Sequence, residues 1–93
     1  MTIEAAARIL IKGRVQGVGY RYFVTAMAGR HGIIGWVRNC ENDDVECEAQ
    51  GPKEALANFI DAIKKGPASA RVDRVLETQV SDRTDENIFD VKY

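Results

Sequence analysis

The sequence predicts an α+β fold of the ferredoxin-like type, a split βαβ sandwich in which two helices cover one face of an antiparallel sheet. The first observation is the order of the periodic segments, which reads β-α-β-β-α-β with a C-terminal edge strand after it. The second is the length, because 93 residues hold one hydrophobic core and not two. The third is that the sequence has no internal repeat or linker. We therefore expect a single domain over residues 1–93.

The first strand and the first helix are predicted over residues 7–15 and 20–31. Alternate residues of the strand are apolar, and most of the residues between them are basic. Apolar residues of the helix recur at helical spacing, and Gly32 suits the position just past its end. The inward residues of the strand are Ile9, Ile11 and Val15, and those of the helix are Tyr20, Phe23, Val24, Met27 and His31.

A hairpin is predicted next, with strands over residues 33–39 and 45–50 and a polar turn between them. The second of these strands alternates cleanly, which puts Cys47 among its inward residues. A register that also buries Val37 leaves Cys40 on the opposite face of the sheet. We therefore predict that the two cysteines do not pair and that both are free thiols.

The second helix carries clear signals at both ends. Pro52 fits its first turn, Glu54 complements the N-terminal end of the helix dipole, and Gly66 with Pro67 ends it. Its apolar residues recur at helical spacing, which predicts one buried stripe. The stripe consists of Leu56, Phe59, Ile60 and Ile63.

Two further strands are predicted after the second helix, over residues 71–80 and 88–92. The polar residues 81–87 between them predict a surface loop. Apolar residues at alternate positions of the last strand indicate that it packs against the core as an edge strand. These residues are Phe89, Val91 and Tyr93.

The composition excludes several classes of function. The net charge is −1, so no general positive field would attract nucleic acid or an anionic membrane surface. The N-terminus has no signal-peptide pattern, and no apolar run is long enough to span a membrane. Two cysteines and one histidine form a poor ligand set for a structural metal. We expect a cytoplasmic, monomeric protein without metal or organic cofactor.

The loop between the first strand and the first helix has the features of a phosphate-binding cradle. Gly17 and Gly19 let the backbone turn and approach an anion without a Cβ in the way. The first turn of a helix leaves backbone N–H groups unpaired, and these groups can converge on one anion. Arg21 adds a fork of donors that matches two phosphate oxygens. The segment therefore predicts a small anion site with its own cation.

The predicted topology brings Asn39 to the same edge of the sheet. The first two strands run parallel with the third between them, so their C-terminal ends lie together. Asn39 offers a carbonyl acceptor and an amide donor, which can orient a water molecule. The loop holds no nucleophile, and the site has neither a strong base nor a metal. Direct attack of water on an activated phosphoryl group is what remains, and a carboxylic–phosphoric anhydride fits this requirement.

Three segments resemble the acylphosphatases: GRVQGVGYR at residues 13–21, GWVRN at 35–39, and VE with EAQGP at 45–46 and 48–52. The resemblance covers nearly the whole chain. It implies hydrolysis of acyl phosphates to a carboxylate and inorganic phosphate, without metal or cofactor. It further implies that Arg21 binds the phosphate and that Asn39 positions the water. The backbone cradle implied by the resemblance comprises Gln16, Gly17, Val18, Gly19 and Tyr20, with Arg21 at its end.

The sequence departs from the pattern of this family in two places, and two other functions stay open. The turn at residues 42–44 lacks the Asp-Gly pair that is frequent there, and Tyr20 stands where phenylalanine is common. An RNA-binding module is one alternative, since RNA-recognition domains share the fold class, although Glu46 and Glu48 would repel phosphates. The other is a non-enzymatic module that binds acyl or carbamoyl phosphate in a larger hydrogenase maturation factor. We expect a stand-alone protein from the end of the sequence at Tyr93.

Overall fold

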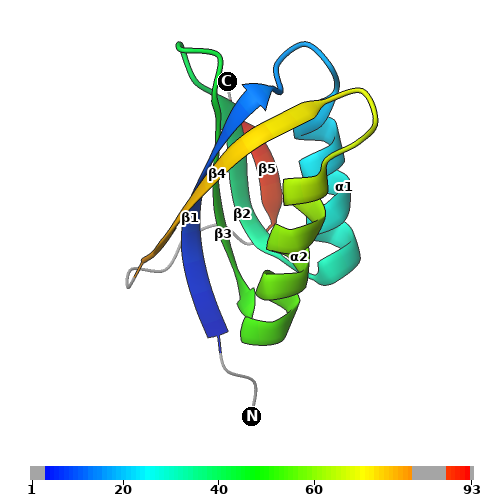
Figure 1. Cartoon of the computed structure of the whole chain (residues 1–93). Helices are drawn as coiled ribbons and strands as arrows, with labels where there is room; N and C mark the ends of the chain where they lie inside the picture. The colour runs from blue at the N-terminus through cyan, green and yellow to red at the C-terminus, as the bar shows by residue number, and fades with distance from the viewer. Residues whose placement is uncertain (1–3, 81–87, 93) are drawn as a thin grey trace.

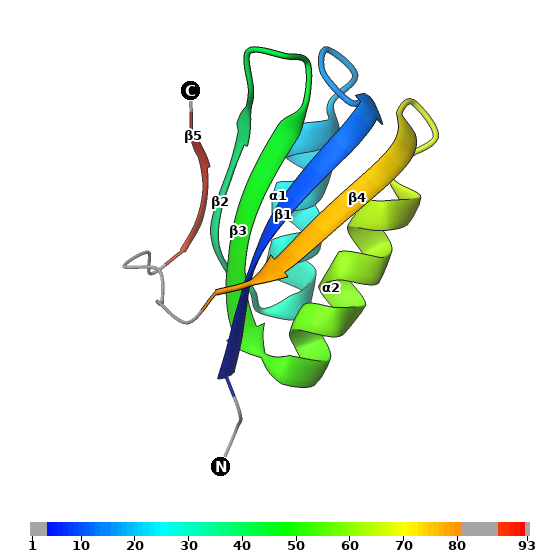
Figure 2. The ribbon, with the colours of Figure 1, turned by 60° about the vertical axis from the view of Figure 1, so that its left-hand side comes forward.

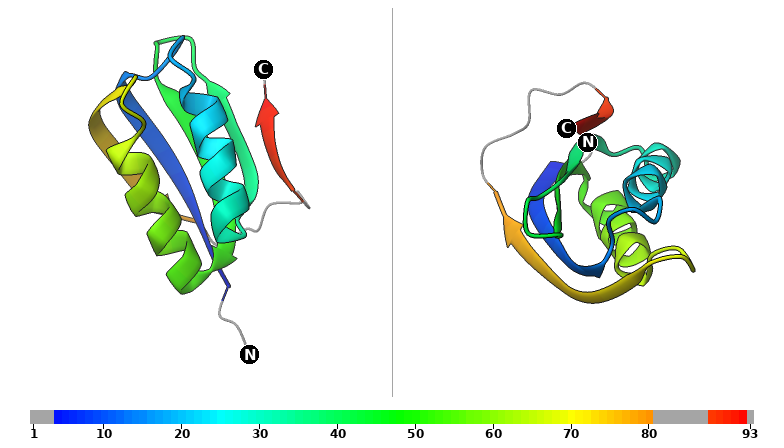
Figure 3. Two further views of the ribbon diagram at one scale, coloured as in Figure 1. Left: turned by 90° about the vertical axis from the view of Figure 1, so that its right-hand side faces the viewer. Right: turned by 90° about the horizontal axis from the view of Figure 1, so that it is seen from above.

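The computed structural model describes residues 4–80 and 88–92, and it has two helices and five strands (Figure 1). Helices α1 and α2 both lie against the same face of the sheet (Figure 3). Within the described residues, the opposite face of the sheet carries no helix. The bounds are β1 Glu4–Arg14, α1 Tyr20–His31, β2 Ile34–Asn39, β3 Val45–Pro52, α2 Lys53–Lys65, β4 Arg71–Gln79 and β5 Phe89–Lys92.

The strand order is β4-β1-β3-β2-β5, which is the order of a split βαβ sheet with one strand added beside β2 (Figure 2). The pairs β1–β3, β1–β4 and β2–β3 are antiparallel, as predicted. The edge strand β5 instead pairs with β2 in parallel, so the sheet is mixed. The prediction of a ferredoxin-like fold is confirmed, and its antiparallel sheet needs this one correction.

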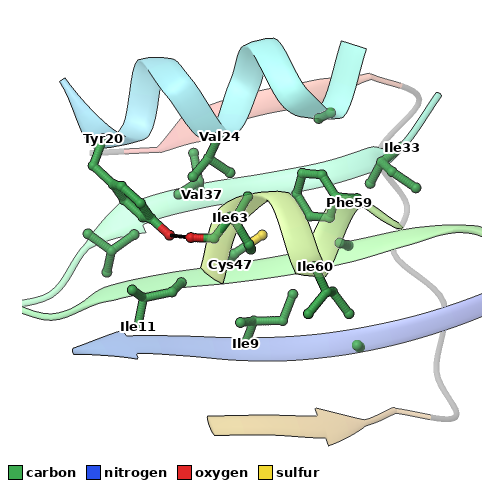
Figure 4. Packing of buried hydrophobic residues seen from close by; sticks show 14 of the residues in the cluster. Ile9, Ile11, Tyr20, Val24, Ile33, Val37, Cys47, Phe59, Ile60 and Ile63 are labelled. Atoms are coloured by element: carbon green, nitrogen blue, oxygen red, sulfur yellow. Dashed lines mark hydrogen bonds between the residues drawn. The ribbon is translucent and has the colours of Figure 1, made fainter. Parts of the chain in front are cut away.

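The core lies between the sheet and the two helices (Figure 4). Side chains from alternate positions of β1, β2 and β3 meet the buried stripe of α2 there. Helix α1 contributes Tyr20, Val24 and Ala28, whereas Phe23 and Met27 are partly buried at the rim and His31 is also partly exposed. The predicted stripe of α2 is confirmed, because Leu56, Phe59, Ile60 and Ile63 are all buried.

Two predicted boundaries differ in detail, and one turn has an unusual backbone conformation. Strand β1 starts three residues earlier than expected and ends at Arg14, one residue before the buried Val15. Its pairing with β4 shifts register between Lys12 and Gly13. Pro52 is the last residue of β3 and precedes α2, because its backbone is extended and not helical. The turn after β2 holds Asp43 at φ 72°, a left-handed conformation that glycine adopts more easily.

The register around the cysteines is the predicted one. Val37 pairs with Cys47 in the core, and Cys40 lies beyond the end of β2, so both thiols are free. Burial raises the pKa of the Cys47 thiol well above its usual range. The packing predicted for β5 is seen at Phe89 and Val91, which contact the core. The predicted loop at 81–87 and Tyr93 lie outside the described residues.

Candidate active site

The loop from β1 to α1 and the C-terminal end of β2 lie at the same end of the molecule, at the top in Figures 1 and 2. The reason is topological. Strands β1 and β2 both run antiparallel to β3, which lies between them, so their chains leave the sheet at one edge. This edge therefore combines a contiguous loop with a strand end that follows it by some 18 positions, between Arg21 and Asn39.

The loop residues adopt the conformations that an anion cradle needs. Gly17 and Gly19 have φ values of 72° and 79°, where a side chain would strain the backbone. Gly19 caps α1 without any side-chain hydrogen bond, and the first turn of α1 contains no acidic residue. The first backbone hydrogen bond of the helix is the one from Phe23 N–H to Gly19 O, at 3.0 Å. The N-terminal N–H groups ahead of it lack helical acceptors and favour a negative ligand.

A pocket of about 300 Å³ opens at this edge and joins the two parts of the site. Arg21 and Asn39 both line it, although they come from different elements. The pocket is therefore bordered both by the start of α1, which carries Arg21, and by the end of β2, which carries Asn39. Its lining residues are Val15, Gly17, Gly19, Tyr20, Arg21, Tyr22, Thr25, Asn39 and Val91.

Asn39 lines this pocket, and its side chain carries a buried acceptor atom. Among the described residues, its Oδ1 is the one buried side-chain nitrogen or oxygen atom that has no hydrogen-bond partner. A buried carbonyl oxygen without a donor costs free energy, on the order of 1–3 kcal/mol, so such atoms are retained where a ligand or water meets them. Asn39 is therefore the residue of this pocket whose side chain carries such an unsatisfied acceptor.

Gln16 and Val18, two predicted cradle residues, do not line this pocket. The Gln16 amide donates hydrogen bonds of 2.8 Å to the carbonyl oxygens of Cys40 and Asp44. These carbonyls belong to the turn that follows Asn39, so the Gln16 side chain ties the start of the loop to the end of β2. The carbonyl oxygen of Val18 accepts a 2.9 Å hydrogen bond from the Ser69 hydroxyl. Both residues therefore brace the loop through contacts away from the pocket.

Tyr20, the first residue of α1, anchors the end of the loop to α2. Its ring is buried, and its hydroxyl donates a 2.8 Å hydrogen bond to the carbonyl oxygen of Ile63 near the end of α2 (Figure 4). Burial raises the pKa of this phenol above its usual range, so it stays a donor. The carbonyls in the last turn of a helix lack helical donors, and this hydroxyl satisfies one of them. The hydroxyl that distinguishes Tyr20 from phenylalanine thus has a defined partner.

Lys12 supplies a further brace beside the site. Its ammonium group contacts the Asp44 carboxylate at 2.7 Å, and the Asp44 side chain is mostly buried. This ion pair and the two Gln16 hydrogen bonds hold the turn after β2 against the end of β1. These contacts cannot be predicted from the sequence, because residues 24 to 32 positions apart show no periodic signal.

The lining of the pocket also includes residues that were not predicted as site residues. Tyr22 and Thr25 lie on the first turns of α1, and Val91 comes from β5. Val91 could not be found from the sequence, since the pairing of a short edge strand has no local signature. Within residues 4–80 and 88–92, no three His, Cys, Asp or Glu side chains gather where they could hold a metal ion. No helix in these ranges is long and apolar enough to cross a membrane.

Comparisons with known proteins agree on one family. The family model for acylphosphatases matches residues 7–91. A curated acylphosphatase of Bacillus licheniformis is 41% identical over 86 residues, which cover 92% of this chain and 96% of that protein. The crystal structure of acylphosphatase from Bacillus subtilis has a TM-score of 0.92 at 37% identity and covers 96% of this chain and 99% of that one.

Some of the similar structures belong to much longer proteins. Full-length HypF, crystallised in a phosphate- and nucleotide-bound form, matches the whole of this chain with a TM-score of 0.91 at 28% identity. The match covers only 12% of the HypF chain. The same fold therefore occurs both in short proteins and as a small part of a larger one.

Proposed function

The chain belongs to the acylphosphatase family, and from this premise we propose that it hydrolyses acyl phosphates by direct attack of water. Family and fold support this activity. The observations that support the mechanism are that Arg21 and Asn39 line one pocket and that the amide oxygen of Asn39 is buried without a hydrogen-bond partner. A protein that only bound phosphate would need Arg21 but would not need Asn39.

Arg21 and the loop bind the phosphoryl group in this mechanism. The guanidinium of Arg21 holds two phosphoryl oxygens, and backbone N–H groups from the loop and the start of α1 hold the others. These donors are fixed before the substrate arrives, so they stabilise the charge that shifts onto the phosphoryl oxygens as the reaction proceeds. The uncapped first turn of α1 supports this role.

Asn39 orients the attacking water. Its Oδ1 accepts a hydrogen bond from the water, which places the water oxygen in line with the bond to be broken. The water oxygen forms a bond to phosphorus while the bond between phosphorus and the carboxyl oxygen breaks. The carboxylate leaves with the electron pair, and the proton of the water passes to solvent or phosphate. The carboxylate is a good leaving group, so the step needs no general acid or metal.

The test of this proposal is hydrolysis of benzoyl phosphate in buffer that contains a chelator. We expect turnover that the chelator does not reduce, with competitive inhibition by inorganic phosphate. A folded protein that hydrolyses no acyl phosphate would contradict the proposal. Turnover that disappears with chelator and returns with a divalent cation would contradict its metal independence.

Replacement of Asn39 tests the positioning of the water independently of phosphate binding. Asn39→Ala is expected to lower kcat by about 100-fold, because the water loses its fixed position. The inhibition constant of inorganic phosphate should stay within about twofold, since the cradle is intact. Steady-state kinetics with phosphate as inhibitor measures both. Asn58→Ala on the exposed side of α2 is the matched control, and an equal loss of turnover and phosphate affinity in Asn39→Ala would contradict the role.

The similarity to a segment of HypF favours a second candidate, a module that binds an acyl or carbamoyl phosphate without hydrolysing it. The same benzoyl phosphate assay distinguishes the two, because such a module would show phosphate binding without turnover.

We further propose a single-domain, monomeric protein of the cytoplasm, where free thiols such as Cys40 and Cys47 persist. We also propose that the protein does not bind nucleic acid. Glu46 and Glu48 lie on β3 and form ion pairs with Arg38 and Arg8, which neutralises these arginines against phosphates.

A further inference from the structure

We propose that the wall of the pocket formed by Tyr22, Thr25 and Val91 is a binding site for the acyl group and selects apolar, above all aromatic, acyl phosphates. The inference rests on the proposed function and concerns the other half of the substrate. The phosphoryl group is held by donors that every acyl phosphate would use equally. Any preference among substrates therefore depends on the rest of the pocket.

Tyr22 is the main feature of this wall. It lies next to Arg21 on the first turn of α1, and its side chain is 82% exposed. Three large hydrophobic side chains are exposed in the described part of the chain, namely Tyr22, Leu76 and Ile88, and Tyr22 is the one that lines the pocket. An aromatic ring beside the phosphate-binding arginine offers a flat apolar surface to the group attached to the phosphate.

Two further side chains extend this surface. Thr25 follows Tyr22 by three positions, so the two are neighbours on the surface of α1. Val91 belongs to β5 and pairs with Val37, two residues before Asn39, which brings it to the end of β2 where the water would bind. Helix α1 lies beside strand β5 (Figure 3). Residues of both elements line the pocket, together with Gly17 and Gly19 of the loop ahead of Arg21.

The chemistry of this lining favours an uncharged acyl group. Within the described residues that line the pocket, Arg21 is the one charged side chain, and the phosphoryl group engages it. The remaining side chains are two valines, two tyrosines, a threonine hydroxyl and the Asn39 amide. A benzoyl group can stack on the Tyr22 ring and contact Val91, whereas an acetyl group has too little surface to use either.

The test compares benzoyl phosphate with acetyl phosphate in the wild-type protein and in Tyr22→Ala. The measured quantity is the ratio of the two kcat/KM values, because the intrinsic reactivities of the substrates cancel when the same ratio is compared between proteins. Tyr22→Ala should lower the benzoyl-to-acetyl ratio by about 3- to 10-fold, the effect of one aromatic contact. Tyr22→Phe, which keeps the ring, should hold the ratio within about twofold of wild type.

The matched control is Leu76→Ala, which removes an exposed apolar side chain from β4, away from the pocket. It should leave the ratio unchanged. Circular dichroism checks that each variant is folded. An active wild type whose ratio is the same in Tyr22→Ala would overturn the acyl site while the proposed function stands. A wild type that hydrolyses neither substrate would overturn both, so the two failures are distinguishable.

Discussion

Helices α1 and α2 cover the same face of the sheet, yet they begin in opposite ways. The first turn of α2 carries Glu54, which complements the positive end of the helix dipole, and its apolar stripe is fully buried. The first turn of α1 has no acidic residue and carries Arg21, a cation at the positive end of the dipole. Tyr22 beside it is exposed, although aromatic rings are usually at least half buried.

This difference fits the proposal that α2 serves packing alone and that α1 also serves binding. A helix that only packs satisfies its ends and buries its apolar face, as α2 does. A helix that departs from these rules at one end is locally unfavourable unless a ligand supplies what is missing. An anion at the start of α1 would pair with Arg21 and the free N–H groups of the first turn together. The composition of the first turn of α1 is therefore consistent with the proposed phosphate site.

The comparison predicts that changes in α2 affect stability and leave chemistry intact. Phe59 is fully buried and meets the ring of Phe89 edge-on, with centroids 5.9 Å apart. Phe59→Ala should lower the free energy of unfolding by about 3–5 kcal/mol, because it leaves a cavity between α2 and the sheet. Urea unfolding measures this loss.

A milder variant keeps the Phe59 prediction testable if the alanine protein does not fold. Phe59→Leu should cost about 1 kcal/mol, and its kcat/KM should stay within about twofold of wild type. A large loss of kcat/KM in folded Phe59→Leu would show that α2 also serves the site, and would break the comparison.

The opposite result is expected at the start of α1. Arg21→Ala should lower kcat/KM for benzoyl phosphate by about 100- to 1000-fold, since it removes the charged donor to the phosphoryl group. Inhibition by inorganic phosphate should weaken in parallel, which distinguishes this variant from Asn39→Ala. The free energy of unfolding should change by less than about 1 kcal/mol. Unaltered phosphate inhibition would mean that the cradle binds through its backbone alone.

The sequence predicted the parts of the molecule that depend on local pattern. The stripe of α2 follows from helical spacing, and the burial of Cys47 beside Val37 follows from strand alternation with one register. The loop with Gly17 and Gly19 is contiguous, so a phosphate-binding loop could be predicted from a single segment. Asn39 was placed beside it by topology, because strands β1 and β2 had to leave the sheet at one edge.

The parts that the sequence did not predict depend on contacts between distant segments. The Gln16 side chain donates to backbone carbonyls of Cys40 and Asp44, and any residue presents such acceptors, so no pattern marks them. Strand β5 has four residues and could pair with either edge of the sheet in either direction. Its parallel pairing with β2 brings Val91 to the pocket, which explains why this wall was missed.

The smallest expected effect concerns the contact that joins the two helices. The Tyr20 hydroxyl donates to Ile63 O, so a residue at the start of α1 completes the end of α2. Tyr20→Phe keeps the buried ring and removes this donor, which should lower the free energy of unfolding by about 1 kcal/mol. Phosphate inhibition should change by less than about threefold, because the cradle consists of backbone groups and Arg21. Urea unfolding and inhibition kinetics on the same preparation measure both quantities. A tenfold weaker phosphate inhibition at nearly wild-type stability would mean that α2 holds the cradle in shape through this bond, and binding could then no longer be assigned to α1 alone.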